Sequence, residues 1–357
     1  MAITKTCLVT GGAGFIGCAI SHVLAGEFET FIVVDNLHPQ VHSSPVRPAS
    51  LHPDAIFIHG DVMSPAVWDN LLATYTPHTV IHLAAETGTG QSLSEASRHG
   101  RVNVVGTTEM LDAFVRHDIV PEHFVLTSSR AVYGDGAWKR GDDLFYPGQR
   151  TREHLAAGQW DFEGAEYRTA AVAETVPHPT SVYGATKLAQ EHILQAWATS
   201  FGSSLSILRL QNVYGPGQSL INSYTGIVTL FARLAREKQV IPLYEDGAML
   251  RDFVFIDDVA RAIAAAVRKP APGTRRFDVG SGKAATIAEA ADFMANRYGA
   301  PEPQVCGKYR FGDVRHASCD LEATLKGLDW HPEVSLSQGL TALCDWVDAM
   351  AKESITA

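Results

Sequence analysis

Short apolar runs recur along the first 210 residues and alternate with segments of helical spacing. The runs that predict strands are residues 7–10, 31–35, 56–61, 80–84, 124–128 and 205–210. The segments that predict helices between them include 15–24, 104–117 and 183–201. Short apolar strands that alternate with helices are typical of a parallel sheet covered on both faces. We therefore predict an α/β fold with a doubly wound parallel sheet of the Rossmann type over residues 1–210.

This rhythm changes after residue 211. A strand and helix over 251–270 look like a return to the first domain, whereas 211–250 and 271–357 predict a smaller mixed α/β C-terminal lobe that binds substrate. Residues 135–179 form a polar insertion rich in turn residues, either an ordered flap or a mobile loop. Long connections inside compact domains are often functional, so we expect the insertion to help shape the substrate pocket.

Composition narrows the possible classes of protein. The chain has 357 residues, of which 46% are hydrophobic, and a net charge of -10. This charge argues against binding to nucleic acid, and no apolar run is long enough to span a bilayer. The five cysteines are scattered without a C-x-x-C pair, so we expect neither disulfides nor a metal site. With no signal peptide visible, we expect a cytoplasmic protein.

A glycine-rich turn follows the first strand and opens the first helix. Gly11, Gly14 and Gly17 allow a tight turn and a close approach of the backbone to a pyrophosphate, which the helix N-terminus then faces. Asp35 ends the next strand, where a carboxylate accepts hydrogen bonds from ribose hydroxyls and repels a 2′-phosphate. The pattern therefore predicts NAD rather than NADP.

A tyrosine and a lysine lie four residues apart on the helix predicted over 183–201. An ammonium on Lys187 close to the phenol of Tyr183 would lower the tyrosine pKa, so that the tyrosine can exchange a proton with a hydroxyl while NAD exchanges hydride. Two serines, Ser128 and Ser129, end the fifth strand at the edge where such sheets place ligands. Either hydroxyl could reach the same substrate oxygen as the tyrosine.

Several motifs together resemble the extended short-chain dehydrogenase/reductase family, with its NAD-dependent epimerases and dehydratases. They are TGGAGFIG, HLAAE from His82, NVVGT from Asn103, SSRAVYG from Ser128, YGATK from Tyr183 and RLQNVYGPG from Arg209. The resemblance implies Tyr183 as the acid and base, Lys187 as its modulator and ribose ligand, and Ser129 as the hydrogen-bond partner. The other expected cofactor contacts are Phe15, Ile16, Asn36, Asp61, Val62, Leu83, Ala84, Ala85 and Thr127. Asp61 could equally be a loop acid that caps a helix.

The resemblance also restricts the reaction. Dehydratases of this family carry Thr-Asp-Glu where this chain has Ser129, Arg130 and Ala131, so the acid and base for loss of water are missing. It therefore implies 4-epimerisation of a nucleotide-diphosphate sugar through a 4-keto intermediate. The implied substrate contacts are Glu86, Ser129, Arg130, Asn212, Arg251 and either Arg310 or Arg315.

Further segments resemble the bacterial dTDP-L-rhamnose 4-epimerase group, which makes dTDP-6-deoxy-L-talose. These are residues 146–153, 217–220, 222–226 and 245–247. Three alternatives stay open: a UDP-glucose or UDP-N-acetylglucosamine 4-epimerase, an NAD-dependent oxidoreductase that releases its keto product, and a noncatalytic NAD-sensing regulator on the same fold. The intact Ser129, Tyr183 and Lys187 disfavour the last. The resemblance further implies a homodimer in which the helices over 104–117 and 183–201 form a four-helix bundle.

Overall fold

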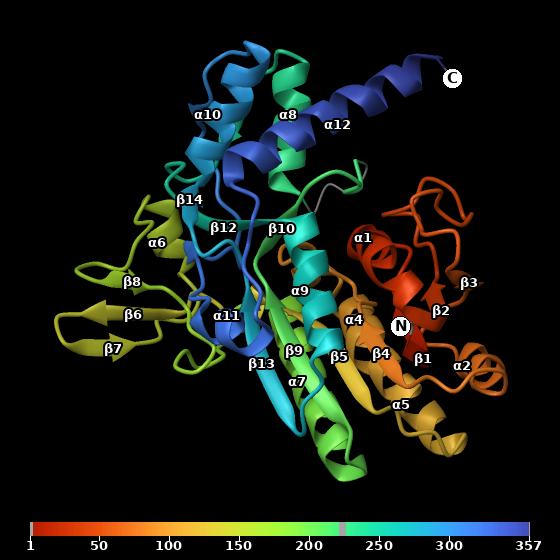
Figure 1. The fold of residues 1–357 in the computed structure, drawn as a ribbon. Coiled ribbons are helices and arrows are strands. Elements are labelled where there is room, and N and C mark those ends of the chain that lie inside the picture. The colour runs from red at the N-terminus through yellow and green to blue at the C-terminus, as the bar shows by residue number, and fades with distance from the viewer. Residues whose placement is uncertain (1–2, 221–225, 357) are drawn as a thin grey trace.

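A seven-stranded parallel sheet lies at the centre of the computed structural model, which describes residues 3–220 and 226–356 (Figure 1). The motif residues 222–225 therefore lie outside the described chain. In sheet order the strands are β13 (Thr274–Val279), β9 (Ser204–Leu210), β5 (His123–Ser129), β4 (Thr79–His82), β1 (Ile3–Thr10), β2 (Phe28–Asp35) and β3 (Ile56–His59). The strand order reverses between β1 and β4. In doubly wound sheets this switch point opens a crevice for ligands.

Helices cover both faces of this sheet, as the apolar strands predict. One face carries α1 (Phe15–Leu24), α9 (Ile256–Arg268) and α11 (Glu322–Leu328). The other carries α2 (Pro65–Leu72), α5 (Gly106–Arg116) and α7 (Val182–Phe201). On β1, Cys7 and Val9 enter the first core and Leu8 the second, because successive side chains of a strand point to opposite faces. Both faces are therefore apolar.

A second unit is built around a smaller sheet above the carboxyl ends of the main strands (Figure 1). Its strands are β10 (Asn212–Tyr214), β12 (Leu250–Phe255), β14 (Ala284–Thr286) and β16 (His316–Ala317). Beside it lie β11 (Pro242–Leu243) paired with β15 (Gln304–Val305), and the helices α8 (Ile227–Arg236), α10 (Ile287–Tyr298) and α12 (Leu336–Thr356). These elements, apart from β15 and β16, share a separate apolar core.

The two units exchange segments differently from the prediction. The segment 251–270 was expected to return to the main domain as a strand and a helix; α9 does so, but β12 belongs to the smaller sheet. Conversely, β13 was assigned to the C-terminal lobe but pairs with β9 in the main sheet. The apolar run in β12 does not reveal which sheet it joins, and Arg275, Arg276 and Asp278 make β13 look less like a strand.

The insertion 135–179 is folded in the structure. It forms an antiparallel sheet of β6 (Ala137–Arg140), β7 (Asp143–Phe145) and β8 (Glu166–Arg168), with the short helix α6 (Arg152–Ala156). This sheet projects from the side of the molecule (Figure 1). The described chain also has short helices α3 (Gln91–Ser94) and α4 (Ala96–His99), a π-helical turn (Gly100–Val105) and 3-10 turns at Ala25–Glu27 and Arg130–Tyr133. No helix within 3–220 and 226–356 is long and apolar enough to cross a membrane.

Candidate active site

A cleft of about 960 Å³ lies at the carboxyl edge of the main sheet and extends under the second unit. Its volume is at the upper end of ligand pockets. Every residue predicted for the cofactor, the substrate or catalysis lines this cleft, except Asp61 and Arg315. The cleft therefore unites motifs that are separated by up to 300 residues of sequence.

The glycine-rich turn is packed so closely against neighbouring backbone that side chains would not fit. Gly11 has a φ of +66°, and a Cβ atom there would lie 2.7 Å from the Cα atom of Ala84 on the neighbouring loop. At Gly17 a Cβ atom would lie 2.3 Å from the Gly12 carbonyl oxygen, so only glycine lets α1 pack against the turn. Gly14 is the N-cap of α1 and lines the cleft with backbone atoms alone. This cradle fits the pyrophosphate of a dinucleotide.

Asp35 lies at the end of β2 and is held by the turn itself. Its carboxylate accepts hydrogen bonds from the backbone N–H groups of Ala13 (3.0 Å) and Leu37 (2.9 Å) while it lines the cleft. Asp61 has a different position: it accepts from the Asn36 amide (3.1 Å) and from the Met63 N–H (2.8 Å), and it does not reach the cleft. Asp61 thus closes the turn after β3 and caps no helix, because the N-cap of α2 is Ser64, without a side-chain hydrogen bond. Its neighbour Val62 lines the cleft.

The predicted catalytic residues meet on α7 and at the end of β5. Ser181 caps α7 by accepting from the Gly184 N–H, so the helix begins at Val182, one residue before Tyr183. The Ser129 hydroxyl lies near enough to the Tyr183 phenol to lower its pKa, and it accepts from the Ala131 N–H at 3.1 Å. Lys187 lies one turn further along α7, and all three side chains line the cleft.

The electrostatics of this group differ from the sequence expectation. Burial raises the pKa of Tyr183, and what lowers it is the hydrogen bond with Ser129 and the charge of Arg130, not Lys187. Burial lowers the pKa of Lys187 to about 7, and the Glu191 carboxylate acts against this shift. The cation that acts on the phenol is therefore Arg130, which the resemblance implies as a substrate contact.

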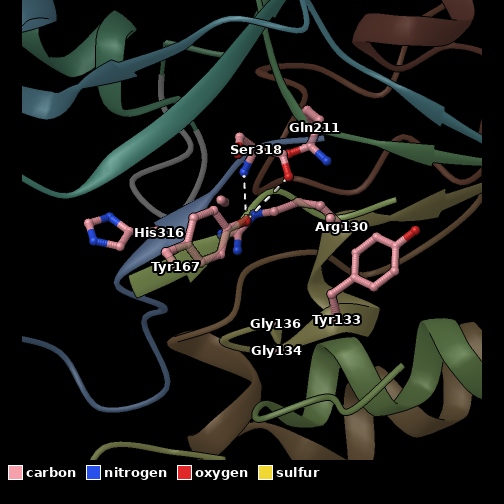
Figure 2. A pocket seen from close by; sticks show the side chains of 10 residues that line it. Arg130, Tyr133, Gly134, Gly136, Tyr167, Gln211, His316 and Ser318 are labelled. Atoms are coloured by element: carbon pink, nitrogen blue, oxygen red, sulfur yellow. Dashed lines mark hydrogen bonds between the residues drawn. The ribbon is translucent and has the colours of Figure 1, made fainter. Parts of the chain in front are cut away.

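Arg130 extends from the turn after β5 toward Tyr167 of the insertion strand β8 (Figure 2). Tyr167 donates to the carbonyl oxygen of Ser318 (3.3 Å) and accepts from its N–H (3.1 Å). Beside them is a cavity of about 10 Å³, room for about one water molecule. Among the described residues, Arg130 Nη1 and Gln211 Oε1 are buried without a hydrogen-bond partner. The insertion thus packs directly behind the catalytic turn.

The loop after β4 is anchored to the catalytic helix. Asn103, on the π-helical turn, is buried; its amide oxygen accepts from the Glu86 N–H (2.7 Å) and its NH₂ group donates to the Thr186 hydroxyl (2.9 Å). The Glu86 carboxylate accepts from Arg98 Nη2 at 2.7 Å. The Glu86 side chain that lines the cleft is therefore paired with Arg98.

Of the three arginines predicted near a diphosphate, two reach the cleft. Arg251 is fixed by donating to the carbonyl oxygens of Leu250 (2.7 Å) and Val314 (2.9 Å), and burial lowers its pKa to about 10. Arg310 also lines the cleft, with its guanidinium 5.0 Å from the centre of the Tyr244 ring.

Arg315 does not reach the cleft, which corrects its assignment. Its side chain is buried among acids: it donates to Asp161 (2.9 and 3.1 Å), Asp246 (2.7 and 2.8 Å) and Glu245 (3.1 Å). Burial opposes its charge, but the hydrogen bonds to Asp246 and Asp161 outweigh that effect and hold its pKa above the usual value. The structure leaves no donor on this guanidinium for a phosphate, because every nitrogen already donates to a carboxylate.

The structure adds cleft residues that the sequence reasoning did not select. They include His38, Gln40, Val41, His42, Pro48 and Ser50 from the segment after β2, together with Arg98, Gln211 and Asp313. The first group comes from a loop without periodicity, so no pattern marks it. Gln211 precedes Asn212, and Asp313 follows Arg310 by three residues. Their closeness to these predicted residues could have pointed to them.

Comparison with known proteins defines the class. Residues 7–280 match the NAD dependent epimerase/dehydratase family, and the chain belongs to that family. It is 59% identical to the dTDP-L-rhamnose 4-epimerase of Burkholderia thailandensis over 344 residues, which cover 96% of this chain and 95% of the relative. It is 29% identical to the UDP-glucose 4-epimerase of Mycolicibacterium smegmatis, over 93% of this chain and 95% of that one.

Solved structures agree with the family. The UDP-glucose 4-epimerase of Thermotoga maritima, in complex with UDP-glucose, superposes with a TM-score of 0.80 at 27% identity, covering 97% of this chain and 99% of that one. The UDP-glucose 4-epimerase of Thermus thermophilus, in complex with NAD, gives 0.75 at 27% identity, covering 96% and 99%. The predicted fold class is confirmed.

Proposed function

We propose that this chain is an NAD-dependent nucleotide-sugar 4-epimerase that interconverts dTDP-L-rhamnose and dTDP-6-deoxy-L-talose. The observation that carries the proposal is the 59% identity, over nearly the whole of both chains, to a dTDP-L-rhamnose 4-epimerase. The side chains of Ser129, Tyr183 and Lys187, which line the same cleft, support catalysis. A regulator without catalysis would have no need of this arrangement.

The chain supplies a site for the cofactor and a base for the sugar. Gly11, Gly14 and Asp35 would hold NAD, which when bound supplies a hydride acceptor and later a hydride donor. Tyr183 takes the proton of the C4 hydroxyl and later returns it, while Ser129 holds the same oxygen. Loss of the proton from the C4 hydroxyl and of the hydride from C4 would leave a 4-keto sugar. Return of the hydride to the opposite face of C4, and of the proton to the oxygen, would invert C4 without net oxidation.

Such a reaction requires a firm hold on the nucleotide diphosphate and a loose hold on the hexose. We place the diphosphate near Asn212, Arg251 and Arg310, where guanidinium groups suit phosphate oxygens. Glu86 and Arg130 line the part of the cleft that we assign to the sugar. Arg130 stands where dehydratases of the family carry an acid, which favours epimerisation over loss of water.

Turnover without added cofactor is the decisive measurement. Purified protein is incubated with dTDP-L-rhamnose and the product is followed by NMR, with Tyr183→Phe as the control variant. We expect formation of the C4 epimer without NADH release in the parent and none in the variant. Stoichiometric NADH would instead favour an oxidoreductase. If UDP-glucose or UDP-N-acetylglucosamine were converted faster than dTDP-L-rhamnose, that sugar would be the substrate instead.

We further propose a homodimer through α5 and α7 and a cytoplasmic location. The exposed apolar side chains Val115 on α5 and Phe201 on α7 support a partner on these helices. Replacing both by serine should shift the protein toward a monomer in sedimentation. An unchanged mass would place the interface elsewhere.

A further inference from the structure

The catalytic lysine lies on the wall of the cleft, almost fully buried, without a hydrogen-bond partner among the described residues. Lys187 is 2% exposed, and a buried ammonium is costly unless an opposite charge compensates it. One turn further along α7 lies Glu191, which is 1% exposed. Residues four apart on a helix are neighbours on one face, so Tyr183, Lys187 and Glu191 follow each other along the same side of α7.

Glu191 is itself held from the sheet below. Its Oε1 atom accepts from the Ser128 hydroxyl at 2.6 Å and from Arg209 Nε at 3.0 Å, and its Oε2 atom accepts from Arg209 Nη2 at 2.7 Å. Ser128 and Arg209 are register partners on β5 and β9, so their side chains share the face that α7 covers. The carboxylate is therefore fixed on two strands directly behind the cleft.

Further buried polar and charged side chains surround Glu191 and Arg209. The Arg209 guanidinium lies 4.8 Å from the centre of the Tyr133 ring, and the Tyr133 hydroxyl donates to Asp278 at 2.9 Å. Asp278 is the register partner of Arg209 on β13. Arg276 approaches Glu191 at 3.7 Å from the same strand. His82 on β4 also faces Lys187, but burial first, and then that lysine, lower its pKa to about 3, so it is neutral.

We infer that Glu191 is a positioning residue for catalysis: held by Ser128 and Arg209, its carboxylate supplies the negative charge that compensates the buried Lys187 ammonium from behind the cleft. Among the groups that face this lysine, Glu191 is the acid that favours its charged form. The inference rests on the proposed function, since it assumes that catalysis uses Lys187 in its charged form. It assigns a role to a carboxylate that touches neither cofactor nor sugar.

The test is the titration of Lys187 in the holoenzyme, followed by NMR of ¹³C-methylated lysines and assigned with Lys187→Arg. Glu191→Gln keeps the shape but removes the charge, so the Lys187 midpoint should fall by about one pH unit or more. Arg209→Met removes the cation that neutralises Glu191, so the midpoint should rise. Ser128→Ala, which removes a hydrogen bond without a charge, should leave it near that of the parent.

Shifts of the Lys187 midpoint in opposite directions in Glu191→Gln and Arg209→Met would distinguish an electrostatic role from a structural one. Loss of packing would lower the activity of both variants without such opposite shifts. The alkaline limb of kcat should move in the same direction as each midpoint. Should Glu191→Gln not fold, the double variant Glu191→Gln/Arg209→Met, compared with Arg209→Met, isolates the same charge. A midpoint that is equal with and without Glu191 would overturn the inference, and it would do so whether or not the parent epimerises any sugar.

Discussion

Arg150 connects the insertion to the loop that carries Arg310 and Asp313, and Arg150→Met tests that connection. Its guanidinium donates to both oxygens of Glu245 (2.9 and 2.7 Å) and to the carbonyl oxygen of Asp313 (3.0 Å). The Arg150 and Glu245 side chains are 2% and 1% exposed. Because Asp313 lines the cleft, we expect the insertion to act as a clamp on the substrate site rather than as a flap.

The loss of stability expected for Arg150→Met follows from the burial of the Arg150–Glu245 pair. Removing one partner of a buried ion pair costs about 3–5 kcal/mol. Glu245 retains Arg315 at 3.1 Å, so we expect the lower value, about 3 kcal/mol. An unfolding entropy of about 2.1 cal/mol/K per residue over 357 residues makes this a fall in Tm of about 4 °C. Arg168→Met, an exposed position on β8 of the same insertion, is the matched control.

Calorimetry gives the stability effect and steady-state kinetics the functional one. Since the Asp313 loop loses its anchor, the KM for the nucleotide sugar should rise about tenfold, as expected for loss of about 1.4 kcal/mol of binding, while the bound NAD per chain stays constant. A fall in Tm with an unchanged KM would refute the clamp and leave Arg150 as a stabilising residue. An unchanged Tm would refute the energetic reasoning.

Three further predictions concern single carboxylates or hydroxyls. Asp35→Ala should purify with less NAD than the parent, because the turn loses the carboxylate that holds it and the ribose loses its hydrogen-bond acceptor. Asp54→Ala, at an exposed position, is the control, and an equal NAD content in Asp35→Ala and the parent would contradict the prediction. Ser129→Ala should lower kcat about 10- to 100-fold with little change in KM, the worth of one hydrogen bond to a charged group; a change confined to KM would disagree. Burial raises the pKa of Asp278 to about 7, so its contribution to stability declines as pH rises from about 4 to about 7. Asp278→Asn should therefore gain stability relative to the parent across that window in urea unfolding, and a difference independent of pH would argue otherwise.

Local patterns predicted the helices and strands around the cofactor well. The helix expected over 15–24 is α1 with the same bounds, because its apolar spacing and the preceding glycines act within one turn of the chain. The meeting of Ser129 and Tyr183 across the insertion was also predicted, from family motifs rather than from spacing. What these features share is that each depends on neighbours in sequence or on a recurring motif.

Pairing between distant segments was not predictable in the same way. Arg315 resembled a phosphate ligand, but its partners Asp161 and Glu245 lie 154 and 70 positions away in sequence. The charge that lowers the pKa of Tyr183 comes from Arg130 on another element, although the helical spacing favoured Lys187. A sequence shows which side chains carry charge, whereas burial and long-range contacts decide which charges meet.

Two buried ion networks stand behind the cleft, and their location bears on their role. Glu191 with Arg209 lies behind Lys187, and Glu245 with Arg150 and Arg315 lies behind the loop of Arg310 and Asp313. Buried ion pairs are often no more stabilising than apolar residues of similar volume, so gain in stability does not explain them. Their hydrogen bonds are directional, however, and each fixes a segment that carries residues of the proposed site. We therefore expect apolar replacement of the whole Glu245 network to preserve folding while loosening substrate binding, and replacement of the Glu191 pair to preserve folding while changing the titration of Lys187.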